Sequence, residues 1–182
     1  ENGHNPARAI SKLIIDIPEL TAREDHRGIV MATVVCVRIG EEAFGTNAGF
    51  GQLMLTIRAE FESELDALDA EICARARAYA RQDGITNVEV QYRDSFPETR
   101  NTPDAVAAVR KARLECELPE ARWDEPFRSS EDFGCYTKLT SGALFYIGCG
   151  TRHAKLHTRE YDFNDEIIEP AVDMMFRLAQ DA

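Results

Sequence analysis

The sequence predicts a mixed α and β protein, in which an antiparallel sheet with two helices precedes a second segment of the chain. Two runs rich in valine and isoleucine or in alternating apolar residues, 29–39 and 52–60, are typical of strands. Apolar residues recur three or four positions apart over 61–83, which is typical of a helix with one buried face. A polar stretch over 95–102, which contains Pro97, separates this part from the rest.

The remaining elements of the first part are predicted from turn and helix signals. Pro6 can occupy the first turn of a helix, and apolar residues follow it at helical spacing until Pro18, which is expected to end the helix. A glycine-rich loop over 40–51 joins the two predicted strands. Gly84 is expected to cap the long helix, and alternating apolar residues over 87–93 predict a third strand.

The predicted order over 1–93 is therefore helix, strand, strand, helix, strand. A ferredoxin-like layer has the order strand-helix-strand-strand-helix-strand, so only its first strand is lacking. Because that strand is normally central in the sheet, its absence leaves a hole. Either the strands pair differently, or the residues in hand begin after the first strand.

The second part of the chain is predicted to contain two helices and a short strand. Thr102 and Pro103 are typical of a helix start, with Thr102 as the cap. A short apolar strand is expected over 143–149. Asn164 and Asp165 are expected to cap a final amphipathic helix. Its apolar residues are Ile167, Ile168, Ala171, Val172, Met175 and Phe176.

Composition and charge exclude several classes of protein. The formal net charge of -11 argues against nucleic acid as the main partner. No apolar run approaches the roughly 20 residues of a membrane helix, and the first residues do not resemble a signal peptide. The five cysteines have no close spacing, which predicts reduced thiols and a cytoplasmic location.

Several short motifs follow one another in a consistent order. The second part contains Ser130-Glu131-Asp132-Phe133, then Gly148-Cys149-Gly150, then Leu156-His157 before an aromatic and acidic run. In the first part, a loop from Gly40 to Gly49 precedes the strand Leu55-Thr56-Ile57-Arg58. Their order and spacing resemble metallopeptidase family 20. These zinc-dependent amidohydrolases include aminoacylases, hippurate hydrolases and carboxypeptidases that release glutamate, and the resemblance covers most of the chain.

The resemblance implies a domain organisation and an activity. It implies a ferredoxin-like lid or dimerisation domain over 1–94 and the C-terminal part of an α/β zinc-peptidase catalytic domain over 95–182. The intact protein would be a homodimeric, metal-dependent amidohydrolase that cleaves N-acyl amino acids or small peptides. It would use two metal ions, which the resemblance implies are zinc. The family's His-x-Asp ligands and catalytic glutamate lie before the lid. No His-x-Asp pair occurs in this sequence, so this chain alone is expected to be inactive.

The same resemblance implies roles for four residues. His157 would be a metal ligand, although one histidine binds zinc weakly by itself and a surface histidine in a loop is the alternative. Arg58 and Asn47 would bind substrate, and Glu131 would line the site. The alternatives are a salt bridge on a strand surface for Arg58, a turn for Asn47 and a solvated acidic turn for Glu131.

A second function remains open, namely a non-catalytic dimerisation or binding module left from a truncated or degenerate family member. The missing ligands favour it, and so do two departures from the family pattern. Gly45 stands where asparagine is common, and Ala48 where proline is common. Two further histidines are expected to have no functional role, His4 as a frayed terminal residue and His26 as a solvated one.

Overall fold

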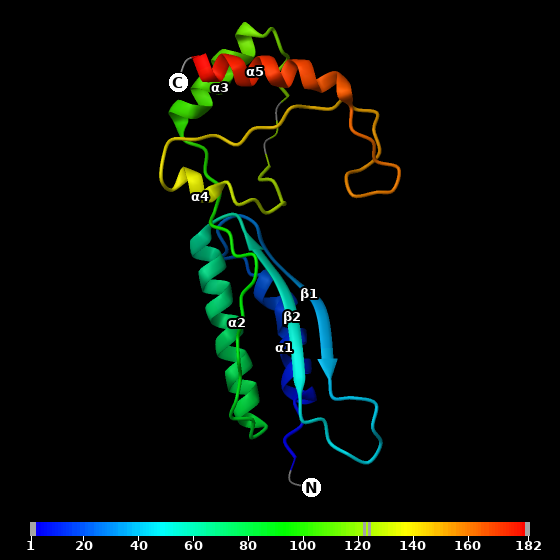
Figure 1. Cartoon of the computed structure of the whole chain (residues 1–182). Helices are drawn as coiled ribbons and strands as arrows, with labels where there is room; N and C mark the ends of the chain where they lie inside the picture. The colour runs from blue at the N-terminus through cyan, green and yellow to red at the C-terminus, as the bar shows by residue number, and fades with distance from the viewer. Residues whose placement is uncertain (1–2, 122, 124, 181–182) are drawn as a thin grey trace. The chain divides into compact units, whose positions relative to one another are not determined.

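The computed structural model describes residues 3–121, 123 and 125–180. The chain forms two compact units, Glu1–Glu98 and Thr99–Ala182. Within the described residues, five α-helices accompany one antiparallel sheet of two strands (Figure 1). The predicted mixture of helices and an antiparallel sheet is therefore confirmed. No described helix combines the length and the apolar character that a membrane crossing needs.

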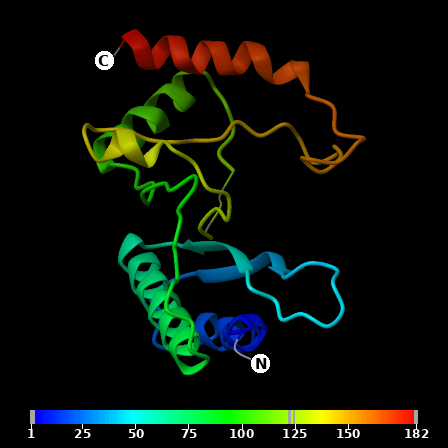
Figure 2. The ribbon, with the colours of Figure 1, turned by 60° about the horizontal axis from the view of Figure 1, so that its bottom comes forward.

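From residue 3 onward, the first unit forms two helices and the sheet. Its elements are α1 (Ala7–Thr21), β1 (Val30–Ile39), β2 (Gly51–Ala59) and α2 (Glu62–Gln82). Both strands and α2 begin and end within one residue of the predicted bounds, because their apolar spacing is regular. Both helices lie on the same side of the sheet (Figure 2).

The sheet turns one side toward the helices and the other toward solvent. The strands pair from Val30 opposite Ala59 to Ile39 opposite Gly51, and a bulge interrupts the register in β1. Along β2 the side chains alternate, as they do in any strand. Leu53, Leu55 and Ile57 are half-buried and pack against the core, whereas Met54, Thr56 and Arg58 are exposed.

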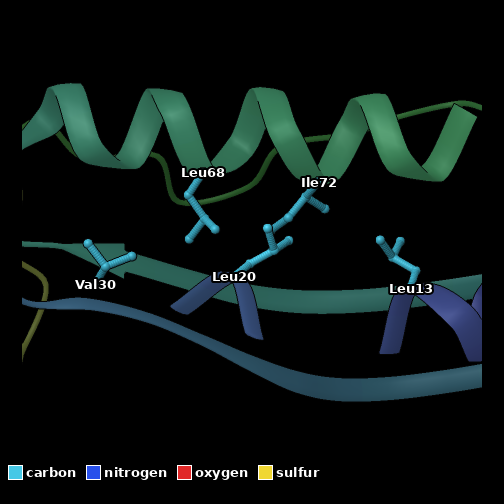
Figure 3. Close-up of a cluster of buried hydrophobic side chains, with 5 residues drawn as sticks. All are labelled: Leu13, Leu20, Val30, Leu68 and Ile72. Carbon is cyan, nitrogen blue, oxygen red and sulfur yellow. The ribbon is translucent and has the colours of Figure 1, made fainter. Parts of the chain in front are cut away.

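The core of the first unit lies between the helices and the sheet. It is a cluster of buried side chains from α1, β1 and α2 (Figure 3). On α2, Leu68 and Ile72 are buried, and Ala76 and Tyr79 pack beside them, which confirms the predicted stripe. The five buried members of the cluster are Leu13, Leu20, Val30, Leu68 and Ile72.

The prediction that Pro18 ends the first helix is wrong, since α1 continues to Thr21. Proline removes only one helical hydrogen bond, and this close to the helix end few further bonds depend on it. The Pro18 carbonyl still accepts a bond from the Ala22 amide at 3.1 Å. Ile17 and Leu20 are 2% and 3% exposed, so burial of the face on both sides of the proline favours the longer helix.

Two predicted strands are absent from the described residues. The segments 87–93 and 143–149 form neither helix nor strand, and neither pairs in a sheet of the described residues. Backbone pairing, and not local sequence, defines a strand, and among the described residues no strand pairs with either segment. The complete ferredoxin-like sheet is therefore not formed by these residues; only its two helices and one hairpin are present.

The described residues of the second unit form three α-helices. These are α3 (Pro103–Glu115), the single turn α4 (Gly134–Thr137) and α5 (Ile168–Gln180), which follows a 3-10 turn over Asp165–Ile167. Asn164 caps that turn by accepting a bond from the Glu166 amide at 3.1 Å, as predicted.

The predicted final helix is present as α5, but most of its apolar residues are exposed. Met174 is the buried residue of this helix. Ile168, Val172, Met175 and Phe176 are 49% to 60% exposed. Alpha-helical spacing correctly identified one apolar face, but the described residues do not cover it.

The start of α3 holds the segment that follows α4. Asn101 makes two bonds with the backbone of Leu144, each 2.9 Å long. The Thr102 amide donates to the Gly142 carbonyl at 3.0 Å. Thr102 precedes the helix as predicted, but its hydroxyl bonds to Ser141 and not to a helix amide. The Asn101 side chain thus holds Leu144, which lies in the segment 143–149 that was predicted to be a strand.

Candidate functional site

His157 lies in a turn whose backbone is strained. Its φ of 67° is in the left-handed region, which residues other than glycine seldom adopt and which is enriched at functional sites. The turn is closed by Thr158, whose amide and hydroxyl both donate to the Lys155 carbonyl, at 3.1 and 2.7 Å. The imidazole is exposed, so the turn presents it to solvent.

Asn164 closes the base of the loop that carries His157. Its side-chain amide donates to the Cys149 carbonyl at 3.1 Å, while its oxygen accepts the Glu166 amide. One side chain thereby joins the glycine-containing segment to the turn before α5. The cap was predicted from the sequence, but the bond to Cys149 was not, because nothing in the spacing indicates it.

The described residues do not complete a metal site around His157. Among them, no group of three or more histidine, cysteine, aspartate or glutamate side chains is placed to hold a metal ion. Zinc sites use three or four protein ligands, so this part of the chain can supply one ligand and not the remainder.

Glu131 lies in the exposed turn before α4, within the same unit as His157. The turn is formed by backbone bonds, among them one from the Cys135 amide to the Asp132 carbonyl at 2.9 Å. In the described part of the chain, Glu131 and His157 share no hydrogen bond or ion pair. The two side chains are thus presented by separate loops of one unit.

Asn47 and Arg58 lie at opposite ends of the sheet in the first unit. Asn47 is in the loop that precedes β2, and Arg58 is the eighth of the nine residues of that strand. A strand rises about 3.3 Å per residue, so the seven steps from Gly51 to Arg58 span about 23 Å. One small substrate cannot contact both side chains within a single chain.

His26 has a defined position that the sequence did not predict. It was expected to be solvated, but its side chain is only 14% exposed and joins the loop after α1 to α2. One ring nitrogen lies 2.7 Å from the Leu20 carbonyl, and the other lies 3.0 Å from a Glu64 carboxylate oxygen. Both partners are acceptors, so the protonated ring satisfies both. The Leu20 carbonyl first, and then Glu64, raise the pKa of His26.

A polar network joins α1 to α2 on the side of the core. Asp16 accepts a bond from the Tyr79 hydroxyl at 2.5 Å and one from Arg75 at 2.9 Å. Arg75 also bonds to Glu71, one helical turn away, at 2.8 Å. The Tyr79 bond is the largest cause that lowers the pKa of Asp16, and the same bond raises the pKa of Tyr79. This network is structural, since it occupies the contact between two helices.

His4 is also held in place, contrary to the expectation of a frayed terminal residue. Its Nδ1 lies 2.9 Å from the Asp83 carbonyl. A side chain in place of the hydrogen of Gly84 would come within 2.4 Å of the His4 ring, so the ring lies directly on the end of α2. This contact holds residue 4 against the end of α2. The partner of the His4 ring is a backbone carbonyl and not an ionisable side chain.

Comparisons with known proteins connect both units to hydrolases. No family model matches the chain. The chain is 24% identical over 176 residues to an uncharacterized hydrolase of Staphylococcus haemolyticus. This match covers 92% of the chain and 45% of that protein.

Two solved structures resemble the chain along nearly its whole length. The YxeP protein of Bacillus subtilis, a dinuclear metal-binding peptidase of the M20 family, has a TM-score of 0.75 with 16% identity. A proposed aminohydrolase of methicillin-resistant Staphylococcus aureus has a TM-score of 0.74 with 18% identity. The matches cover 96% and 95% of this chain and 45% of each solved chain. At such identities the likeness is one of fold, and the chain spans less than half the length of these proteins.

The order of the sequence motifs and the fold of the matched structures both indicate the same protein family. The resemblance to metallopeptidase family 20 that the sequence indicated is confirmed, and the chain has the fold of part of an M20-family peptidase.

Proposed function

We propose that this chain is part of a metal-dependent amidohydrolase that cleaves the amide bond of N-acyl amino acids or small peptides. The observation that carries the proposal is the fold, which nearly the whole chain shares with a dinuclear metal-binding peptidase. Homologous proteins are hydrolases. Because the chain spans 45% of them, the rest of the catalytic apparatus would come from residues other than these.

In this proposal His157 is one metal ligand. Its strained turn holds the imidazole in the open, where a ligand from another part of the protein could meet the same ion. A zinc ion bound in such a site would activate a water molecule. The described residues do not supply the other ligands, so in this proposal those ligands come from residues other than the described ones.

The proposed substrate-binding residues divide into two groups. Arg58 would bind a carboxylate, for which a guanidinium has suitable geometry, and Glu131 would line the site near His157. Asn47 lies too far from Arg58 to contact the same small molecule. In a homodimer there are two alternatives. Asn47 and Arg58 of one chain would each contribute to a different substrate site, or Asn47 of one chain would share a site with Arg58 of the other chain.

The experiment compares two histidine variants of the protein expressed from its complete gene. We expect His157→Ala to lower the hydrolysis of N-acetyl amino acids at least about 100-fold, because loss of even an outer-shell partner of a metal costs about 10- to 100-fold. His153→Ala is the matched control, since His153 is exposed in the same loop and bonds only to the adjacent Ala154 carbonyl in the described chain. Equal activity of wild type and His157→Ala would reject the role of His157.

A non-catalytic dimerisation module is the second candidate, and one feature of β1 favours it. Within the described residues its outer edge has no neighbouring strand, and Val35 and Val37 on this strand are 62% and 40% exposed. An open edge with apolar residues readily pairs with another chain. Sedimentation equilibrium of the 182-residue chain tests this candidate: a dimer supports it, and a monomer at high micromolar concentration contradicts it.

A further inference from the structure

We propose that His26 is a pH-sensitive latch. Its protonated ring holds the loop between α1 and β1 closed against the start of α2, and loss of the ring proton releases this loop while the rest of the unit stays folded. We call this loop, residues 22–29, the latch loop. The inference rests on contacts within the first unit and is independent of the proposed hydrolase activity.

The latch loop has little backbone support of its own. In the described chain, bonds between backbone groups hold only its two ends. The Ala22 amide bonds back to α1, and the Ile29 carbonyl accepts from the Glu60 amide at 2.8 Å. Between these ends, each residue of 23–28 except His26 is exposed. A segment with few buried contacts opens at a lower free energy than the core of the same unit, so the latch loop can open by itself.

Side chains hold the latch loop against the start of α2. The Arg27 guanidinium donates to the Ser63 hydroxyl at 3.1 Å and lies 3.9 Å from the centre of the Phe61 ring. The Ile29 amide donates to a Glu60 carboxylate oxygen at 3.2 Å. An arginine stays protonated at every pH that a protein normally meets, so the two Arg27 contacts do not change near neutral pH.

The contact of His26 does depend on protonation, because both of its ring nitrogens face acceptors. One nitrogen lies 2.7 Å from the Leu20 carbonyl at the end of α1, and the other lies 3.0 Å from a Glu64 carboxylate oxygen on α2. A protonated imidazole has two donors, whereas a neutral one has a single donor and a lone pair on its other nitrogen. Loss of the proton therefore replaces one of the two bonds by a repulsion between a lone pair and an oxygen.

The other charged groups around the ring keep their charge where His26 titrates. Glu64 on α2 and Asp25 in the latch loop are carboxylates, and their pKa values are lowered, that of Glu64 by the bond from His26 and that of Asp25 by the bond from Arg23. Arg23 and Arg27 are arginines and remain protonated. Among these described groups, the ring of His26 is therefore the one that changes charge near neutral pH.

The direction of the pH effect follows from linkage. The bonds of the closed loop raise the pKa of His26 above its ordinary 6.5, so the closed loop is fully favoured below that pH. Above it, the ratio of open to closed loops should rise by up to about tenfold per pH unit and become constant above the closed-state pKa. An open loop would expose the start of α2, where Ser63 and Phe61 contact Arg27 in the closed loop.

Amide hydrogen exchange of the 182-residue chain, measured by NMR, tests the latch. The reporter is the Ile29 amide, which meets the Glu60 carboxylate when the loop is closed. Its protection factor is the exchange rate of an unprotected amide at the same pH divided by the measured rate. We expect this factor to fall by up to about tenfold per pH unit above pH 6.5. The Gly40 amide, which bonds to the Phe50 carbonyl at the other end of the sheet, should keep a constant protection factor.

Two histidine variants separate the latch from other effects of pH. In His26→Gln the side chain carries no charge and does not titrate, so the Ile29 protection factor should be at least about tenfold below that of the wild type near pH 6, the loss expected for a bond to a charged group. It should then stay constant as pH rises. His153→Gln is the matched control, because the His153 ring bonds only to the adjacent Ala154 carbonyl among the described residues. This variant should keep the pH dependence of the wild type.

Two results would overturn the latch. The first is an Ile29 protection factor that does not change with pH in the wild type, or that changes equally in His26→Gln. The second is equal protection of Ile29 and of the core residue Ile72 at every pH and urea concentration, because the loop would then open only when the whole unit unfolds. The latch instead predicts weaker protection at Ile29 than at Ile72, and a weaker dependence on urea.

Discussion

Replacement of Leu20 by alanine tests the packing of α1 beyond Pro18. Leu20 is 3% exposed and belongs to the five-residue cluster at the centre of the first unit. A buried Leu→Ala change costs about 2–5 kcal/mol, and we expect about 3 kcal/mol here because the cluster is small and the cavity can partly collapse. For a unit of this size, each kcal/mol lowers Tm by about 4–8 °C, so Leu20→Ala should lower Tm by about 12–24 °C.

Ile15→Ala is the matched control on the same helix, since Ile15 is 67% exposed. It should change the free energy of unfolding by less than about 0.5 kcal/mol. Urea titration followed by circular dichroism measures both variants, and their m-values should agree with that of the wild type. If Leu20→Ala and Ile15→Ala differ by less than about 1 kcal/mol, Leu20 is not packed in the core and the extended helix is refuted.

Two further predictions concern ionisable groups of the first unit. Because bonding raises the pKa of His26 above its ordinary 6.5, its stabilising effect is complete below that pH and is lost as pH rises through the folded-state pKa. The urea midpoint of the wild type should therefore fall between pH 6 and 8.5 more than that of His26→Gln, and equal falls would contradict the role of the ring. Tyr79→Phe should raise the pKa of Asp16 toward its ordinary 3.8, as followed by the NMR titration of the Asp16 carboxyl carbon. An unchanged Asp16 titration would show that the Tyr79 bond does not lower this pKa.

The sequence predicted those elements whose periodicity is local and strong. Both strands and α2 were found within one residue, since alternation and helical spacing each extend over a long run. Pro18 was misinterpreted because the burial of Leu20 beyond it is a tertiary effect. The segment 87–93 has the alternation of a strand, but a ladder needs a partner that the described residues do not provide.

The site was less predictable than the fold, because its residues act through contacts that spacing does not reveal. Sequence order indicated His157, but the left-handed turn around it became apparent only in the structure. His26 seemed to be an ordinary loop residue, yet two acceptors from distant positions hold its ring. Asn47 and Arg58 are close in sequence, and the rise of an intervening strand separates them.

Metal content is the most direct test of the proposal that this chain belongs to a metal-dependent hydrolase. Protein expressed from the complete gene, wild type and His157→Ala, would be equilibrated with zinc, dialysed and measured by plasma mass spectrometry. The account predicts two metal equivalents in the wild type, as in a dinuclear relative, and a loss of at least one in His157→Ala. Equal metal content in the two proteins, or no metal in the wild type, would contradict it.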